Sequence, residues 1–326
     1  MSDMEEDAVL TDGEGEEETR PKEPQVCHLT QETIRQGLSL LCRTGYGLGH
    51  AFVRLDLKDK GLNDIAAISS YIHIRFLDVS NNHLTDLSPL ASLTQLLWLK
   101  VDNNAVACFK GQPFAQLPFL QWLSMAGNRL TDIDGFATPT LEYLNLTGNS
   151  IQRMIGFQSD CFANLVILEL RGNQLDTTDG INLPNLQQLY LAQNVIKRLE
   201  GLEKLERLTI LHLRDNQLDS LNGLSAGMKC LQLLNVRGNV IEDINALQSL
   251  NLVSTSLRAL VLSENPVVET SDYRLSVLMI LPQLEQLDKD PVSSDERAEA
   301  RQRIKVRTHY ISLFDCNDDQ NGEVSD

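Results

Sequence analysis

Leucines recur along the chain in an eleven-residue pattern, whose cleanest copy is LEYLNLTGNSI at residues 141–151. Within this copy Leu141, Leu144 and Leu146 alternate with polar or aromatic neighbours, which predicts a short strand with one buried face. Asn149 follows where the chain must turn, and its amide can donate to and accept from backbone groups that the turn leaves unpaired. A single copy has nothing to bury its leucines against, so the pattern requires neighbouring copies.

Ten copies occur within residues 51–267, and the pattern is that of leucine-rich repeats. Connectors such as residues 85–93 and 199–205 are too short for a full helix and predict a turn of helix. The expected fold is therefore an α/β leucine-rich-repeat solenoid, with a curved parallel sheet of about ten strands and short helical turns on its convex side. The corner position is asparagine in every copy except the first, and is occupied by Lys60, Asn82, Asn104, Asn128, Asn149, Asn173, Asn194, Asn216, Asn239 and Asn265.

The segment before the repeats, residues 26–50, predicts an N-terminal helical cap. Thr30 suits a helix N-cap, and Ile34, Leu38 and Leu41 would share one face of a helix that ends before the glycines from residue 45 onward. That apolar face would cover the open end of the first repeat. Residues 1–25 are rich in Glu, Asp, Gly and Pro and predict a disordered arm.

The pattern changes after the last repeat. Residues 268–292 resemble the C-terminal cap shared by axonemal, splicing and phosphatase-regulating leucine-rich-repeat proteins. Ser293 and Glu296 have the spacing of a capping box, which predicts a basic helix over residues 293–314. An acidic tail, residues 315–326, closes the chain.

The third position of the pattern points away from the core, on the concave side of the expected sheet. Four consecutive copies carry an aromatic residue there, and these include both tryptophans of the chain. Exposed columns of this kind are typical of protein-binding surfaces, although the rings could instead stack along the sheet and cover it. The predicted partner-binding residues on this face are Phe76, Trp98, Trp122, Tyr143, Ile167, Tyr190 and His212.

Two sets of basic residues are secondary candidates. Arg171, Arg214 and Arg237 occupy the seventh position, where they would pair either with an acidic partner or with nearby acidic residues of the chain. The basic stretch at residues 297–307 would form a solvated helix or dock on a partner. Neither pattern by itself decides between the two interpretations.

Charge and composition limit the classes of function that the protein could have. Hydrophobic residues make up 42% of the 326 positions, enough for a large core. Of the net charge of −17, residues 1–24 carry −8 and residues 315–326 carry −5, so residues 25–314 carry only −4. This balance argues against nucleic-acid binding. The start of the chain lacks the apolar run of a signal peptide, and no segment has the length of a membrane span, which favours a cytoplasmic protein.

No set of residues in the sequence indicates a catalytic site or a metal site. The six cysteines are scattered without metal-ligand spacing, and the six histidines share no common face or spacing, so no Ser-His-Asp or Cys-His set can be argued. We therefore expect a non-enzymatic protein with no cofactor, no metal and no small-molecule substrate.

Some segments resemble a narrower group of leucine-rich-repeat proteins, because the likeness extends to residues that the repeat pattern does not dictate. The segments GLSLLCRTG at residues 37–45 and SYIHIRFLDVSNNHLTDLSPL at residues 70–90 resemble radial-spoke leucine-rich-repeat proteins of motile cilia and flagella, as do residues 180–186, 211–218 and 257–262. The resemblance implies a scaffold at the axoneme, part of the cytoskeleton, that supports spoke-head assembly by contacting other radial-spoke proteins. The repeat type leaves open two alternatives, a regulatory subunit that binds a phosphatase catalytic domain and a ribonucleoprotein adaptor.

Overall fold

The fold was obtained as a computed structural model that describes residues 27–45 and 47–318, with side chains described as far as residue 306. The predicted acidic arm, residues 1–25, lies outside the described residues, as does most of the predicted acidic tail. The last described helix continues to Asp318, into the segment predicted to be tail.

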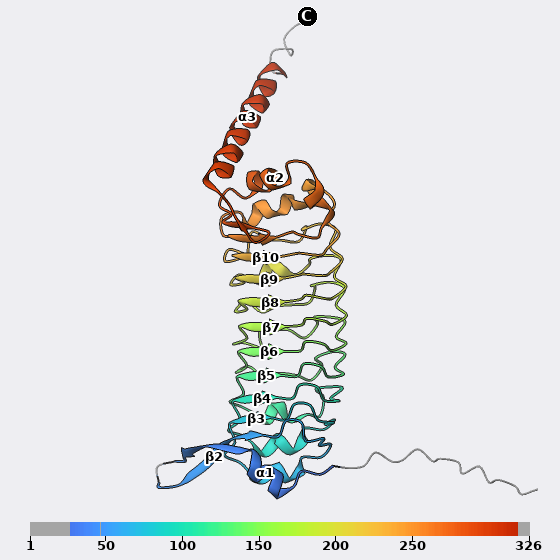
Figure 1. The fold of residues 1–326 in the computed structure, drawn as a ribbon, viewed down its shortest axis with the longest axis vertical. Helices are drawn as coiled ribbons and strands as arrows, with labels where there is room; N and C mark the ends of the chain where they lie inside the picture. The colour runs from blue at the N-terminus through green and yellow to red at the C-terminus, as the bar shows by residue number, and fades with distance from the viewer. Residues whose placement is uncertain (1–26, 46, 319–326) are drawn as a thin grey trace, which may run out of the picture.

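One sheet of thirteen strands runs the length of the molecule, with the strands in the order of the sequence (Figure 1). Strands β2 to β12 are parallel, while β1 and β13 pair antiparallel at the two ends. Ten strands, β2 to β11, carry one repeat each, which confirms the predicted solenoid. The strands are β1 Leu38–Arg43, β2 His50–Asp56, β3 Phe76–Asp78, β4 Trp98–Lys100, β5 Trp122–Ser124, β6 Tyr143–Asn145, β7 Ile167–Glu169, β8 Gln188–Tyr190, β9 Ile210–His212, β10 Leu233–Asn235, β11 Ala259–Val261, β12 Gln286–Leu287 and β13 Asp290–Pro291.

The predicted alternation determines which side chains form the core. In β6, Leu144 is fully buried while Tyr143 and Asn145 on either side are half-buried, and the same pattern recurs in nearly every repeat strand. The nine corner asparagines are only 4–9% exposed. Asn149, for example, donates from Nδ2 to the carbonyls of Met125 and Leu146 at 3.0 Å, and its Oδ1 accepts from the Leu130 amide at 3.0 Å. The corner role predicted for asparagine is confirmed.

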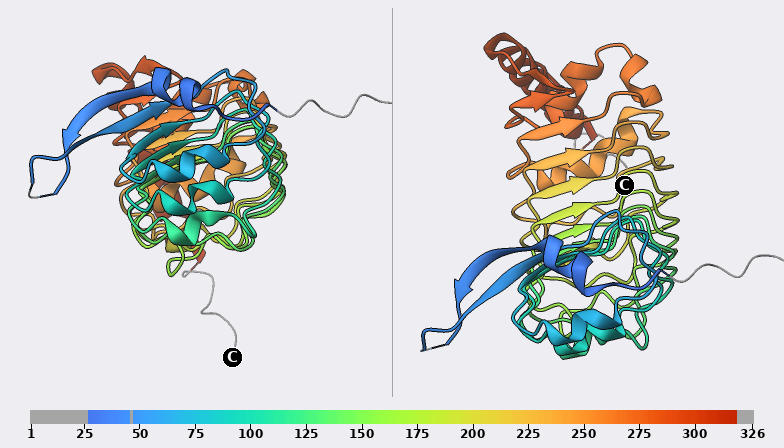
Figure 2. Two further views of the ribbon diagram at one scale, coloured as in Figure 1. Left: turned by 90° about the horizontal axis from the view of Figure 1, so that it is seen from below. Right: turned by 60° about the horizontal axis from the view of Figure 1, so that its bottom comes forward.

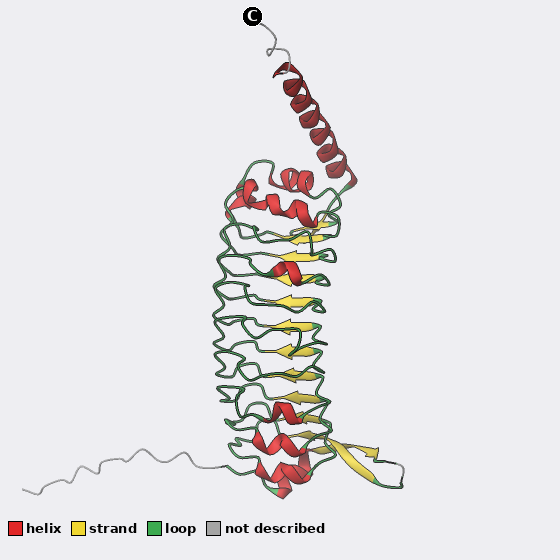
Figure 3. Cartoon of the chain, turned by 180° about the vertical axis from the view of Figure 1, so that it is seen from behind, coloured by secondary structure: helices red, strands yellow, loops and turns green. Residues whose placement is uncertain are grey.

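The convex side, opposite the sheet in Figure 3, is built of short connectors. Six of them contain 3₁₀ turns, as expected, but from β5 to β8 and from β9 to β10 the described connectors contain no helix. Glycines with positive φ, such as Gly135 and Gly156, interrupt these connectors. The 3₁₀ segments are η1 Ala66–Ser70, η2 Ser88–Ser92, η3 Pro113–Gln116, η4 Leu202–Lys204, η5 Ile244–Val253 and η6 Pro266–Glu269.

The N-terminal end differs from the prediction. Helix α1 spans Gln31–Gly37, with Thr30 as its N-cap and Ile34 buried, but it ends at Gly37. Leu38 and Leu41 lie in β1 instead, where Leu41 is opposite Phe52 of β2. The helix prediction for residues 38–44 was wrong, because pairing with β2 satisfies the backbone of this segment better than a further helical turn. Figure 2 shows the resulting hairpin extending away from the solenoid.

The C-terminal end is covered by η6, by helix α2 (Tyr273–Ile280) and by the short strands β12 and β13. Helix α3 (Ser294–Asp318) then projects beyond the last repeat (Figure 1). The Glu296 amide donates to Ser293 Oγ at 3.2 Å, and the Ser293 amide donates to Glu296 Oε2 at 2.8 Å. The predicted capping box is therefore confirmed.

Candidate functional site

The outward side of the sheet, called the concave face below, brings the predicted binding residues together in two groups. Their side chains flank the buried middle residue of each strand and are all half-buried. The first group occupies facing positions of five neighbouring strands, and the second occupies facing positions of β8 and β9. The first group is Phe76, Trp98, Trp122, Tyr143 and Ile167, and the second is Tyr190 and His212.

Three rings of the first group form a continuous stack, called the aromatic stack below. The Trp98 and Trp122 ring centroids are 4.5 Å apart with the planes inclined by 14°. Trp122 and Tyr143 are 4.8 Å apart and inclined by 1°. Among the described residues, no ring contact joins Phe76 to this stack. The rings thus do stack along the sheet, as one of the two interpretations expected, and they remain half-buried.

Tyr143 is held in place by its hydroxyl group. Tyr143 Oη donates to Glu169 Oε1 of the next strand at 2.8 Å. Partial burial, and then the bond to this carboxylate, raise the pKa of Tyr143 well above its usual range. The phenol therefore remains a neutral donor, and the stack ends on a fixed hydrogen bond.

The second group lies beside a cavity of about 290 Å³ toward the C-terminal half of the face. The Tyr190 and His212 rings are 5.0 Å apart, and Tyr190 Oη donates to Gln188 Oε1 at 2.9 Å. Burial lowers the pKa of His212, so its imidazole is neutral at pH 7. This part of the face offers hydrogen-bonding groups rather than a net charge.

The three arginines of the seventh position are engaged within the chain. Arg171 Nε donates to Gln193 Oε1 at 3.0 Å. Arg214 Nε lies 3.0 Å from Asp215 Oδ2, and Arg237 forms an ion pair with Glu264. Internal pairing, one of the two predicted interpretations, therefore describes Arg214 and Arg237.

The basic residues of α3 are also partly engaged. Arg303 pairs with Asp272 and with Glu299, at 3.0 and 3.2 Å. Arg297 Nη1 donates to the Pro282 carbonyl at 3.3 Å. These contacts attach the start of α3 to the C-terminal cap, which sequence reasoning had not foreseen.

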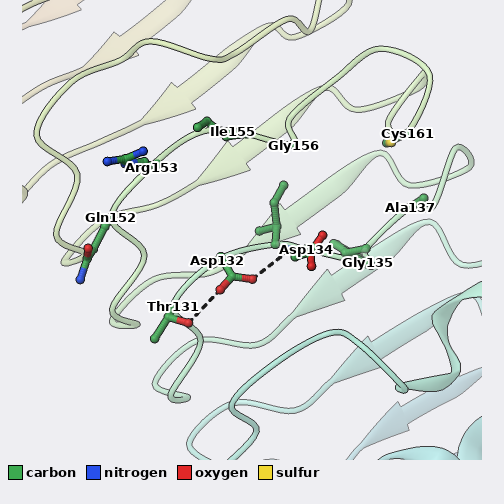
Figure 4. A pocket seen from close by; sticks show the side chains of 12 residues that line it. Thr131, Asp132, Asp134, Gly135, Ala137, Gln152, Arg153, Ile155, Gly156 and Cys161 are labelled. Carbon is green, nitrogen blue, oxygen red and sulfur yellow. Dashed lines mark hydrogen bonds between the residues drawn. The ribbon is translucent and has the colours of Figure 1, made fainter.

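A larger cavity, of about 630 Å³, lies among the connectors between β5 and β7 (Figure 4). Asp132 accepts from the Thr131 hydroxyl and from the Asp134 amide within the same connector. Burial raises the pKa of the Cys161 thiol, so this cysteine is not activated as a nucleophile. Sequence reasoning missed this cavity, although glycines at positions 135 and 156 of successive connectors were a signal for it.

In residues 27–45 and 47–318, no cluster of three or more His, Cys, Asp or Glu side chains is arranged to hold a metal ion. Within the same part of the chain, none of the helices combines the length and the apolar character needed to cross a bilayer. The concave face therefore remains the candidate site.

Comparison with known proteins decides the family. Residues 164–310 match a protein-family model described as leucine-rich repeat, and residues 73–93 match a second of the same description. Human leucine-rich repeat-containing protein 23 is 49% identical over 280 residues, which cover 85% of this chain and 80% of that protein. The chain belongs to the leucine-rich repeat-containing protein 23 family. The bovine member is 51% identical over 272 residues, covering 83% of this chain and 78% of its own length.

Solved structures agree on the fold of this family member. The solenoid of the TLR13–ssRNA13 complex superposes with a TM-score of 0.60 at 24% identity, covering 72% of this chain and 35% of that one. This likeness concerns the fold alone. The family membership and the matching family model identify the chain as a protein-interaction scaffold of the leucine-rich-repeat class.

Proposed function

We propose that this protein is a non-enzymatic structural scaffold of the motile-cilium or flagellar axoneme, a radial-spoke component that supports spoke-head assembly by binding other spoke proteins. In this proposal residues 51–267 form the binding scaffold, residues 26–50 and 268–292 cap it, and the concave face is the binding surface. The aromatic stack is the observation that carries the proposal, because it places both tryptophans of the chain side by side on the outward side of the sheet.

The aromatic stack suits a protein partner. Large rings provide much contact area and lose little conformational entropy on binding. Here the rings are already held by stacking and by the Tyr143–Glu169 hydrogen bond, so a partner would not need to order them. Phe76 and Ile167 extend the column by one strand on either side.

The second group and the arginines fit a supporting role. Tyr190, His212 and the cavity beside them present donors and acceptors to a partner that extends past the stack. The three arginines each already have a partner within the chain, so they would orient a bound protein more than they would attract it. They are Arg171, Arg214 and Arg237.

The proposal is tested by replacing both tryptophans with alanine in the full chain and measuring co-purification with spoke proteins from ciliated cells. We expect co-purification to be lost while the cooperative unfolding transition of the chain in denaturant is retained. Ile167→Lys, which adds a charge to the same column without removing a ring, should also weaken binding. Ile155→Ala, at an exposed apolar residue of a convex connector, is the matched control and should bind normally.

Unchanged co-purification of the double alanine variant and of Ile167→Lys would exclude the concave face as the binding surface. Stoichiometric recovery of a phosphatase catalytic subunit from cells without motile cilia would instead support the regulatory alternative. Salt-sensitive binding to RNA would support the ribonucleoprotein alternative.

A further inference from the structure

The β1–β2 hairpin is longer than the repeat architecture requires. β2 has seven residues, whereas each of the strands β3 to β11 has three, and among the described strands β1 pairs with β2 alone. The extra length carries the hairpin beyond the side of the solenoid (Figure 2). Leu41 and Phe52, which lie opposite each other in the two strands, are 58% and 44% exposed.

The exposed side of the hairpin continues the concave face. Alternate residues of β2 point to opposite sides, and Val53 and Leu55 are buried while Phe52 and Arg54 are exposed. Arg54 lies in register with Phe76, the first aromatic residue of the concave column. A partner on the hairpin would therefore lie next to one on the sheet without covering the aromatic stack.

β1 is also a free edge. It is the terminal strand of the sheet, and within the described residues no strand pairs with its outer side. Leu40 has a φ of 58°, which breaks the extended conformation and leaves residues 41–43 as the regular part of the edge. An edge of this kind is a template for the addition of an extended segment from another protein.

The charge of the hairpin indicates which segment fits. Asp56, at the end of β2, is the one acidic residue of the hairpin Leu38–Asp56, and its Oδ1 accepts from the Lys58 amide at 3.0 Å. The hairpin is therefore basic, in a chain whose net charge is −17. Arg54 has no ion-pair partner among the described residues. Within the same part of the chain, the Arg43 side chain makes one hydrogen bond, from Nε to the Gly47 carbonyl at 2.8 Å. Complementarity favours an acidic occupant, and a second hairpin of the same charge is disfavoured.

We propose that the hairpin is a docking arm for an extended acidic segment of a partner protein, added as a strand along residues 41–43. Apolar side chains of the segment would pack on Leu41 and Phe52, and its carboxylates would pair with Arg43 and Arg54. This contact is separate from the aromatic stack and goes beyond the function proposed above.

The test uses the full chain and two synthetic octapeptides, one alternating glutamate with valine and one alternating lysine with valine. We expect the glutamate peptide to bind about tenfold more tightly or better, and to slow hydrogen exchange of the amides of residues 41–43. Leu41→Glu should abolish this protection. Leu252→Glu, at a 50% exposed leucine near the other end of the solenoid, is the matched control and should leave it intact.

Equal binding of the two peptides, or protection confined to another part of the sheet, would overturn the proposal. A dimer seen in analytical ultracentrifugation that Leu41→Glu dissociates would also overturn it, by assigning the arm to a second copy of the chain. Loss of spoke-protein binding in the tryptophan variants with normal peptide binding would leave both proposals standing. Retained spoke-protein binding in the tryptophan variants, again with normal peptide binding, would remove only the concave-face proposal.

Discussion

Trp122 and Tyr143 lie with their rings parallel to within 1° and their centroids 4.8 Å apart, although 21 residues separate them in the chain. Their strands are neighbours in register, so the repeat itself places one ring over the other. Trp98 continues the arrangement on the preceding strand. The most aromatic part of the concave face is thus built from rings that neighbouring repeats hold in contact with one another.

The stacking of Trp98 on Trp122 predicts exciton coupling between the only two indoles of the chain. Far-ultraviolet circular dichroism should show a couplet that disappears in Trp98→Phe and equally in Trp122→Phe. Phe119→Leu, at an exposed ring outside the stack, should retain the couplet. A spectrum that the two tryptophan replacements leave unchanged would contradict the stack.

Tyr143→Phe should lower the free energy of unfolding by about 1 kcal/mol at pH 7, because it removes a hydrogen bond to a carboxylate while keeping the ring in the stack. The raised pKa of Tyr143 adds a dependence on pH. The folded state favours the protonated phenol, so this stabilisation is complete below the unfolded pKa of about 10 and is lost as pH rises above it. Denaturant titrations at neutral and alkaline pH should show a smaller alkaline loss in Tyr143→Phe than in the parent chain.

Tyr273 provides an internal check on that experiment. Its hydroxyl donates to Asp288 Oδ2 at 2.6 Å, and burial followed by this bond raises the pKa of Tyr273 as well. Tyr143→Phe should therefore retain part of the alkaline loss, and a further replacement, Tyr273→Phe, should reduce it again. An alkaline loss that neither replacement changes would contradict both assignments.

Asn149→Ala should destabilise the solenoid by about 2–3 kcal/mol, because it leaves the Leu130 amide and the carbonyls of Met125 and Leu146 buried without their partner. Asn145→Ala removes the bond that Asn145 Oδ1 accepts from the Thr147 amide and a contact with the Tyr143 hydroxyl. Both lie at a half-buried position, so the cost should be less than about 1 kcal/mol. Denaturant midpoints of the two variants give the comparison. Equal costs would show that the corner asparagine has no special role.

Glu296 should make the attachment of α3 sensitive to acid. Its contact with Arg274, and then the bond from the Ser293 amide, lower the pKa of Glu296 to about 2. The stabilisation is present above the unfolded pKa of about 4.3 and is lost as pH falls from there through the folded pKa. Hydrogen exchange of residues 294–300 should therefore accelerate as pH falls below about 4, relative to the intrinsic rate. Glu296→Gln should show fast exchange already at neutral pH.

Short-range features of the fold were predictable from the sequence. The Ser293–Glu296 capping box and the Thr30 N-cap involve residues three positions apart, so residue types and spacing alone decide them. The buried corner asparagines followed from a pattern that repeats every 21 to 26 residues, because each repeat meets only its neighbours. The same reasoning placed the aromatic residues on one face. It left open whether their rings stack, because that depends on side-chain conformations that spacing does not determine.

Only the tertiary structure decided the features that depend on a partner elsewhere in the chain. Residues 38–43 carry a helical spacing of leucines, yet they form β1 because β2 offers a pairing strand. A side chain at position 37 would lie 2.2 Å from the Asp56 carbonyl, so only glycine allows the close approach at which the helix gives way to the hairpin. Glu169 could have paired with Arg171 beside it, but it accepts from Tyr143 across the sheet. Composition and periodicity thus determined the solenoid, whereas contacts between strands determined the ring stacking on its concave face and the β1–β2 hairpin.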